Sequence, residues 1–441
     1  YLYTEPIEIK DVSNEPYQFA KVTTNFASQT RLPKKNIFKG TVVRAVAVAD
    51  DIFYPSIVGN SYFITNEVDK YDLPVVSIIT DPAGLFDYEK GIYVPGKIMD
   101  EWRASNTSDK HNNGNPANYS QNGIEWDRYG QLNYFDNSLL NGYDKKIKIK
   151  IHGGWTRAQS DKSFRIYAKN KYDLSDVIDY PFFNDLKDNN NKAITTFNRL
   201  LLRTSGNDLG NTRYRDALTQ GLLKHLPLST QAYSPLIQFV NGEYWGIINL
   251  REGYDKYYFA SHFNVDIDDV AILYHNLGID EGYVSDINNF QSIIDFSQTN
   301  DLQLSQNIEF IDRHINIESL IQYFAAEMYI ANKDWPHNNQ RLWRYKKGTY
   351  SKEKLFGIDG RWNWVLYDTD FGFGLGEDMR YTTNEFERIF SSSVTEKVTL
   401  FLKDILVNDS IQNFFSNIVS DQINSCFKPD YVHSKVDEFN S

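Results

Sequence analysis

The period of the hydrophobic residues changes once along the chain, and this change constrains the fold more than any other feature. Between about residues 145 and 252, apolar and polar residues alternate in short runs typical of strands, and one helical pattern interrupts them at about 212–225. From about residue 315, apolar residues recur at helical spacing instead. Strands first and helices afterwards predict an α+β fold built of two parts.

Several elements in these two regions are well defined by their patterns. Strands are predicted at residues 145–154, 162–169, 198–205, 234–241 and 243–252. A helix capped by Asn316 is predicted, and its carboxyl end should lead directly into the segment 332–339. A buried strand at 362–374 should follow, and then amphipathic helices near 394–407 and 410–427. The final residues stop in mid-pattern, so we interpret the domain as truncated near its carboxyl end.

The first third of the chain divides into three segments. Residues 1–66 alternate in short runs between turn residues, which predicts a small antiparallel β unit. Residues 71–96 predict two strands around an Asp-Pro turn. Residues from 100 to about 140 are rich in Asn, Ser and Gly without periodicity, and we expect a solvated insertion there.

Composition excludes several classes of function. The formal net charge of −12 argues against binding to nucleic acid, and no apolar run approaches the length of a membrane span. The single cysteine excludes an internal disulfide and a cysteine-based metal site. The chain opens at Tyr1 without a leader pattern, and its 30 Tyr and its Asn- and Ser-rich loops are typical of extracellular proteins, so we expect a mature segment of a secreted or cell-surface protein.

Two acidic motifs in the helical part have the spacing needed for phosphoryl transfer from ATP. That reaction needs a carboxylate to orient the acceptor hydroxyl and oxygen ligands to hold magnesium against the phosphates. Asp334 and Asn339 stand five residues apart, as do the base and the metal-binding Asn of a protein-kinase catalytic loop. Asp370 opens an Asp-Phe-Gly tripeptide, and Asp368 should share its face of a strand. Two carboxylates on one face favour a bound divalent cation, although two solvated carboxylates at a strand end remain an alternative.

Longer segments carry a resemblance to a known family. In one order over roughly residues 71–400 the chain contains LPVVSIITDP…GIYV, IKIHGGWTR…KSFRIYAK, LLLRTS…TRYRDAL, FVNGEYWGIINLREGYD, NKDWPHNN…WRY and WVLYDTDFGFG. Together they resemble the CotH kinase family of atypical protein kinases, named for a spore-coat protein. The resemblance implies a bilobal, protein-kinase-like domain over 67–441, with an amino-terminal lobe at about 67–252 and a carboxyl-terminal lobe at about 253–441.

The same resemblance implies roles for particular residues. Asp334 is then the catalytic base, and Asn339 with one or both of Asp368 and Asp370 binds the metal. The segment 153–162 is then expected to cover the phosphates of the nucleotide. Residues 36–64 in turn resemble the last strands of the β-sandwich domain appended to chitobiase-type enzymes. A β extension of the main domain is the alternative for this fragment.

Four residues of the strand region have both a functional and a structural interpretation. Arg157 and Lys162 are the best candidates for phosphate contacts, but a Lys that opens a strand is usually a solvated edge residue. Arg203 is expected to pair with Asp216, as in the strand–helix ion pair of kinases, or to form a buried structural salt bridge. Glu252 lies where a kinase hinge begins, so it contacts either the nucleotide or a nearby Arg.

The leading hypothesis is therefore a kinase that transfers the γ-phosphoryl group of ATP, with Mg²⁺ or Mn²⁺, to Ser or Thr of secreted, cell-surface or spore-coat proteins. A non-catalytic scaffold or adhesion protein that uses a kinase-like fold for binding is the second hypothesis. A carbohydrate-active enzyme is the third, and it fits worst, because carboxylates two residues apart cannot flank a glycosidic bond from opposite sides at the roughly 5–9 Å that hydrolysis requires. His337 has no second His at metal-ligand spacing and is expected to be a loop residue.

Overall fold

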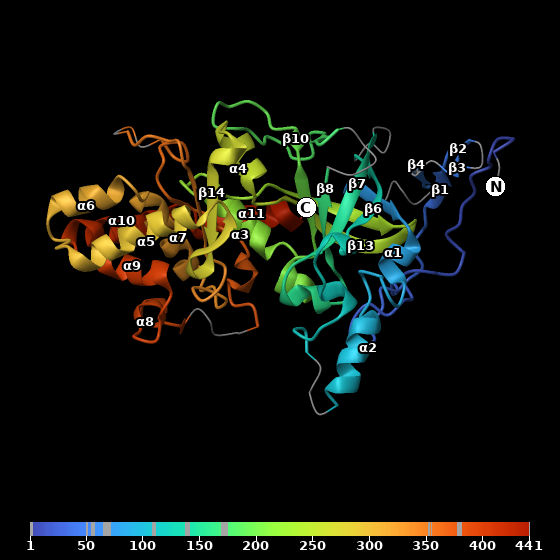
Figure 1. Cartoon of the computed structure of the whole chain (residues 1–441), viewed down its shortest axis with the longest axis horizontal. Coiled ribbons are helices and arrows are strands. Elements are labelled where there is room, and N and C mark those ends of the chain that lie inside the picture. Colours follow the sequence, from blue (N-terminus) through green and yellow to red (C-terminus); the bar gives the residue numbers. More distant parts are fainter. Residues whose placement is uncertain are drawn as a thin grey trace. The chain divides into compact units, whose positions relative to one another are not determined.

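The chain forms two compact units. The structure, a computed structural model, describes residues 3–49, 52–53, 58–64, 72–107, 112–136, 142–168, 175–351, 353, 355–376 and 382–440. Unit 1 contains Tyr1–Asn184, Thr195–Gly206 and Tyr233–Glu252, and unit 2 contains Asp185–Ile194, Asn207–Ala232 and Gly253–Ser441. Unit 1 holds a β-barrel and unit 2 is mainly helical (Figure 1), so the predicted α+β class is confirmed.

Unit 1 is built mostly of strands. They are β1 (Thr41–Ala45), β2 (Val48–Ala49), β3 (Ile52–Phe53), β4 (Val58–Tyr62), β5 (Val75–Thr80), β6 (Arg128–Phe135), β7 (Gly142–His152), β8 (Ser163–Tyr167), β9 (Ile178–Asp179), β10 (Thr196–Phe197), β11 (Arg199–Arg203), β12 (Tyr233–Val240) and β13 (Glu243–Glu252). Two helices accompany them, α1 (Pro82–Phe86) and α2 (Gly96–Ser105).

A closed barrel with the strand order β11-β13-β12-β5-β6-β7-β8 forms the core of unit 1. Its neighbours pair antiparallel except β5 and β12, which run parallel, and β8 pairs with β11 to close the ring. Alternate residues of β7, namely Ile147, Ile149 and Ile151, are buried while the lysines between them are not. The alternation seen in the sequence therefore points one face of the strand into the barrel. All five strands predicted between 145 and 252 are confirmed, as β7, β8, β11, β12 and β13.

Two expectations for the first third of the chain are wrong. The segment from 100 to 140 is not a solvated insertion, because it contains part of α2 and all of β6, which lies between β5 and β7 in the barrel. Residues 91–94 form no strand. They are buried and bonded back to the short helix α1, with the amides of Ile92 and Tyr93 donating to Gly84 and Leu85. The backbone amides of Ile92 and Tyr93 therefore make local hydrogen bonds in place of the inter-strand hydrogen bonds that a second strand would need.

The amino-terminal segment packs on the barrel. Glu243 is 4% exposed, and its carboxylate accepts the backbone N–H groups of Gln18, Phe19 and Ala20 at 2.5, 3.1 and 2.7 Å. Phe38 packs against Phe239 of β12 with ring centroids 5.4 Å apart and the ring planes tilted by 31°. Whether this segment is a sandwich fragment stays a prediction, but it is attached to unit 1 by buried contacts.

Replacing Glu243 with alanine is expected to destabilise unit 1 by about 2–3 kcal/mol. The change removes an ionised acceptor and leaves three backbone donors without it, and hydrogen bonds to a charged group contribute more than neutral ones. The midpoint of chemical denaturation, followed by tryptophan fluorescence, measures the loss. Glu8→Ala, at a carboxylate that is 77% exposed, serves as the control and should leave the midpoint unchanged. Equal midpoints for the two variants would contradict this anchoring role.

Unit 2 combines helices with one sheet. The helices are α3 (Arg215–Leu223), α4 (Lys256–Phe263), α5 (Val284–Thr299), α6 (Ser305–Asp312), α7 (Ile317–Tyr329), α8 (Glu385–Phe390), α9 (Lys397–Ile405), α10 (Asp409–Asn424) and α11 (Pro429–Asn440). The strands are β14 (Val270–Tyr274), β15 (Gly278–Glu281), β16 (Arg341–Tyr345) and β17 (Asn363–Trp364), in the order β15-β14-β16-β17.

Helix α7 is the central helix of unit 2. The side chain of Asn316 accepts the amide of Ser319 at 3.1 Å, so the predicted cap is confirmed. Nearly every residue of α7 is buried, and the helix packs on α10, α8 and β17 (Figure 1). The predicted helices near 394–407 and 410–427 are confirmed as α9 and α10. Across the described part of the chain, none of the helices has both the length and the apolar character needed to cross a bilayer.

Candidate active site

The loop that follows α7 is fixed in the core of unit 2. Trp335 is fully buried, and its ring lies 5.0 Å from that of Phe324 and 6.0 Å from that of Tyr323, centroid to centroid. The hydroxyl of Tyr323 also donates to the carbonyl of Asn339 at 2.9 Å. Helix α7 therefore holds both the middle and the end of the loop, and it places the polar residues between them at the surface of the unit.

Asp334 and Asn339, predicted as base and metal ligand, are in contact. The Asn339 Nδ2 donates to the Asp334 Oδ2 at 3.1 Å and lies 3.5 Å from the carbonyl oxygen of Asp368. Asn338 donates to the other carboxylate oxygen of Asp334 at 3.0 Å, and His337 Nε2 lies 3.5 Å from it. The side chain of Asp334 remains 31% exposed, so an acceptor hydroxyl has access to it. The loop thus presents an oriented carboxylate beside an amide.

The segment with the other two acidic residues is not the predicted strand. Pairing with β16 covers only Asn363–Trp364, and Asp368 takes a left-handed conformation with φ 57° and ψ 44°. Thr369–Phe371 then form a short 3₁₀ helix, η8. Asp368 and Asp370 are therefore not alternate residues of one extended strand, and the prediction that they share a strand face is wrong. The left-handed residue breaks the extended backbone that such an arrangement needs.

Helix α3 fixes the segment that carries Asp370. The Asp216 carboxylate accepts both the amide and the hydroxyl of Thr369, at 2.9 and 3.1 Å. Asp370 is 1% exposed, and its Oδ2 accepts the amide of Asn207 at 2.8 Å. Arg215 donates to the carbonyl of Phe373 at 3.0 Å, so α3 contacts the segment on both sides of Asp370. These contacts pre-organise the acidic segment before any ligand binds.

The sequence analysis missed several residues of this arrangement. Asp208 is fully buried and accepts from the backbone and side chain of Arg215 and from the hydroxyl of Thr212. Glu327 and Asn332, at the end of α7, were also missed. For Glu327 the sequence contained a signal, because a charged residue stands among the apolar residues of a helix. Ionisable side chains are seldom buried without a partner or a function.

Negative charge dominates the interior of this region. The pKa of Glu327 is raised to about 8, mainly by burial and to a smaller extent by the neighbouring carboxylates of Asp216 and Asp368, against the lowering effect of the hydrogen bond from Asn332 and of the Arg388 charge. The negative potential of Asp216 and Asp368, which favours the protonated form of Glu327, also attracts a cation.

Magnesium fits the donor set at the predicted residues. The Asn339 nitrogen donates to Asp334, so the Asn339 amide oxygen and the carboxylates of Asp368 and Asp370 are the donors that would hold the metal. All of these are oxygen donors, and Mg²⁺ in phosphoryl-transfer sites typically uses one or two carboxylates together with phosphate oxygens. Within the described ranges, no three or more His, Cys, Asp or Glu side chains gather as a preformed metal cage.

The predicted phosphate-binding residues of unit 1 contact their own loop. Lys162 is 1% exposed, and its Nζ donates to the carbonyls of Arg157 and Gln159 at 2.6 and 2.7 Å. Burial holds the pKa of Lys162 well below its usual range. The Arg157 guanidinium donates to the carbonyl of Gly153 at 2.6 Å and to the side chain of Asn122 at 3.0 Å. Both cations stabilise the 153–162 loop, and their contact with a nucleotide stays a prediction.

The remaining two candidates lie on neighbouring barrel strands. Arg203 ends β11 and is half-buried, and Glu252 ends β13 and is 3% exposed. Glu252 pairs across the ladder with Leu200. Arg203 belongs to unit 1 and Asp216 to unit 2, so the ion pair proposed between them stays a prediction.

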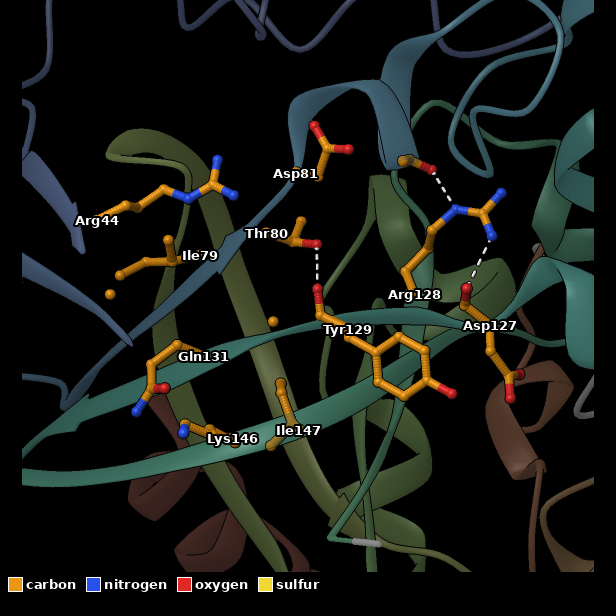
Figure 2. Close-up of a pocket in the computed structure, with 13 residues that line it drawn as sticks. Arg44, Ile79, Thr80, Asp81, Asp127, Arg128, Tyr129, Gln131, Lys146 and Ile147 are labelled. Carbon is orange, nitrogen blue, oxygen red and sulfur yellow. Dashed lines mark hydrogen bonds between the residues drawn. The ribbon is translucent and has the colours of Figure 1, made fainter. Parts of the chain in front are cut away.

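Unit 1 also contains a cavity of about 290 Å³ between β1, β4 and the barrel strands β5, β6 and β7. Figure 2 shows the Thr80 hydroxyl donating to the carbonyl of Tyr129, and Arg128 donating to the carbonyls of Gly84 and Asp127. None of the residues predicted to bind nucleotide or metal lines this cavity.

The comparisons with known proteins agree with the geometry of unit 2. A search of curated proteins gives no match to the chain. The family model described as CotH kinase protein matches residues 149–441, about two thirds of the chain. The matched range includes the loop with Asp334 and Asn339, the acidic segment and helix α3 that fixes it. The chain therefore belongs to the CotH kinase protein family.

Proposed function

We propose that this protein is an atypical protein kinase that transfers the γ-phosphoryl group of ATP to Ser or Thr hydroxyls. Family membership implies kinase activity and the use of ATP. The observation that carries the proposal is the contact of 3.1 Å between Asp334 and Asn339, beside the backbone of Asp368. Phosphoryl transfer requires a base for the acceptor and oxygen ligands for the metal at adjacent positions, and these residues supply both.

Asp334 acts on the acceptor in this reaction. Its carboxylate accepts the hydroxyl hydrogen bond and takes the proton as the acceptor oxygen bonds to the γ-phosphorus. The bond from the γ-phosphorus to the β–γ bridging oxygen breaks, and its electron pair leaves with ADP. Asn339 and Asp334 hold each other in place, which contributes orientation rather than chemistry. Magnesium, when held by Asn339, Asp368 and Asp370, neutralises the charge that develops on the phosphate oxygens.

The division of the chain supports a bilobal organisation. The last strand of the barrel ends at Glu252 and unit 2 resumes at Gly253, which corresponds to the boundary expected between the lobes. We assign residues 67–252 to the amino-terminal lobe, with Arg157, Lys162, Arg203 and Glu252 as its nucleotide-facing residues, and residues 253–441 to the carboxyl-terminal lobe. Asp185–Ile194 and Asn207–Ala232, which include α3, are the exceptions within the first range, because they belong to unit 2. The Tyr-rich composition supports a secreted, cell-surface or spore-coat location for this chain, and its proposed substrates are proteins of the same location.

Transfer of label from γ-labelled ATP tests the proposal. The full chain, with magnesium, is expected to label a Ser-rich peptide mixture or its own Ser and Thr residues. A matched reaction with α-labelled ATP controls for simple retention of nucleotide. Absence of transfer, together with absence of ATP binding, would count against the kinase assignment.

One observation favours a scaffold as the second candidate function. Both cations of the 153–162 loop, Arg157 and Lys162, are engaged by backbone carbonyls. A protein that kept the fold but not the reaction could use such a loop only for stability. Binding of ATP or of a protein partner without any transfer to an acceptor would support this function over catalysis.

ATP binding is expected to depend on a divalent cation. The carboxylates of Asp368 and Asp370 repel the triphosphate unless a cation lies between them, so chelation should weaken binding by at least about tenfold. Calorimetric titration of ATP with magnesium, with manganese and with excess chelator measures this. The same affinity for ATP in all three titrations would contradict the assignment of Asp368 and Asp370 as metal ligands.

A further inference from the structure

Glu327, in the last turn of α7, is a buried carboxyl that the proposed reaction does not use. It is fully buried, and its Oε2 accepts the side-chain Nδ2 of Asn332 at 2.9 Å. Its Oε1 has no hydrogen-bond partner among the residues that the structure describes. A buried polar atom without a partner lowers stability, so the fold alone does not account for a Glu at this position.

The hydrogen bond from Asn332 continues to the proposed base. The other end of the Asn332 amide, Oδ1, accepts the backbone N–H of Asp334 at 3.1 Å. Asn332 is itself fully buried, and its own N–H donates to the carbonyl of Glu327 at 3.2 Å. A continuous path therefore runs from the Glu327 carboxyl through one side-chain amide to the backbone of Asp334.

The direction of the Asn332 amide decides whether this path holds. An amide group has a donor end and an acceptor end of the same shape, and its orientation depends on what each end faces. An acceptor at Glu327 turns Nδ2 toward α7, which leaves Oδ1 for the amide of Asp334. Without an acceptor at Glu327, the donor end of the Asn332 amide loses its bond to α7, and the amide is then held only by the bond from the Asp334 N–H to its Oδ1.

Other contacts hold the loop without setting this amide. Arg388 of α8 donates to the carbonyls of Trp335 and Asn332, at 2.5 and 3.1 Å, and Glu385 accepts from Arg388. These bonds fix backbone oxygens of the loop. They place no constraint on the Asn332 side chain, so the path from Glu327 is an additional and specific constraint on Asp334.

We propose that Glu327 is a positioning residue that fixes the Asn332 amide and, through it, the backbone of the base Asp334. Its catalytic consequence rests on the proposed kinase function, whereas its structural consequence does not. Glu327 is not a catalytic residue in this proposal, because the path reaches the reacting groups only through Asn332. Burial supports a neutral carboxyl at this position near pH 7, because it raises the pKa of Glu327 to about 8. Glutamine, which keeps an acceptor oxygen and the same shape, is then the closest substitute.

Four variants test the catalytic consequence. Glu327→Leu and Asn332→Ala are each expected to lower kcat for phosphoryl transfer by about 10–100-fold with little change in the KM for ATP, since small displacements of a catalytic group have effects of this size. Glu327→Gln should retain kcat. The double variant, which combines Glu327→Leu with Asn332→Ala, should lose no more than either single variant, because both act on one path.

Gln322→Leu is the matched control. Gln322 is a buried polar residue of the same helix, 6% exposed, and its side chain accepts from Gln422 at 2.6 Å. Its loss should lower the stability of unit 2 but leave kcat unchanged. Equal loss of kcat in Glu327→Gln and Glu327→Leu, or full additivity with Asn332→Ala, would overturn the proposal.

Hydrogen exchange separates this proposal from the proposed function. The backbone amide of Asp334 is expected to exchange at least about tenfold faster in Glu327→Leu than in wild type, and at the wild-type rate in Glu327→Gln, because exchange follows local opening. This measurement requires no activity. If wild type transfers no phosphate but the exchange rates differ as expected, the kinase assignment fails and the positioning role stands. If the Asp334 amide exchanges equally in all three proteins, the positioning role fails whatever the activity.

Discussion

Asp334→Asn is expected to reduce phosphoryl transfer by about 10²–10⁴-fold while the affinity for ATP stays close to that of wild type. The Asp334 carboxylate contacts the acceptor hydroxyl in the proposed reaction, and it is needed when the proton leaves rather than when the nucleotide binds. Asparagine preserves the shape of the side chain but has one acceptor oxygen in place of two, so it can accept from only one of the neighbouring amides of Asn338 and Asn339. The rate of label transfer and the dissociation constant for ATP, measured on the same preparations, give the two quantities.

Asp370→Asn provides the contrast. A metal ligand holds the nucleotide in the ground state as well as in the transition state, so this variant should weaken both ATP binding and transfer. Asp301→Asn, at an exposed acidic residue of the same unit, should change neither quantity. If Asp334→Asn transfers phosphate at the wild-type rate, the base is misassigned, and Asp368 is the next residue to replace.

Glu327→Gln is expected to stabilise unit 2 increasingly as the pH rises from about 4.5 to 8. The pKa of Glu327 is raised from 4.5 to about 8 by burial in the folded state. In this window the unfolded chain has released the proton and the folded chain has kept it, so folding takes up a proton and wild-type stability falls with pH by about 1.4 kcal/mol per pH unit. A glutamine side chain cannot ionise, so the variant avoids a loss on the order of 4 kcal/mol at the upper end of the window.

Chemical denaturation of both proteins at about pH 5 and about pH 8 measures this difference. The gap between wild type and Glu327→Gln should be small at the lower pH and large at the higher one. Glu318→Gln, on the exposed side of the same helix, is the matched control and should show one constant gap. A gap for Glu327→Gln that does not grow with pH would show that the buried carboxyl ionises with nearly the same pKa in both states.

The sequence correctly predicted those segments whose structure depends on residues nearby in the chain. Helix α7 follows from the Asn316 cap, which bonds Ser319 three residues later, and from apolar residues that recur every three to four positions. Strand β7 follows from the strict alternation of Ile and Lys, because in an extended strand every second side chain lies on the same face. The contact between Asp334 and Asn339 is similarly local, because one loop spans the two residues.

Strand β6 was missed because distant partners make its burial possible. It carries Gln131 and Asn133 on buried positions, where polar side chains are costly unless they are paired. Asn133 accepts the amide of Ser61, and Gln131 donates to Asp144, at 3.0 Å in both cases. Neither partner can be identified from the polarity pattern of the segment itself, so a strand that buries Gln131 and Asn133 resembles a loop in the sequence.

The amino-acid sequence by itself determined the α+β class, most strands of the barrel, the helices α3, α7, α9 and α10, and the loop that brings Asp334 and Asn339 together, because each depends on spacing within a few residues. Only the tertiary structure decided the conformation around Asp368. There the carboxylate of Asp216, on the distant helix α3, accepts the amide of Thr369, and the pairing of β17 with β16 ends at Trp364. The tertiary structure also decided the environment of Glu327, where burial first, and the charges of Asp216 and Asp368 to a smaller extent, raise the pKa of the carboxyl. Desolvation and electrostatic fields depend on positions in space, and residues far apart in the chain create them.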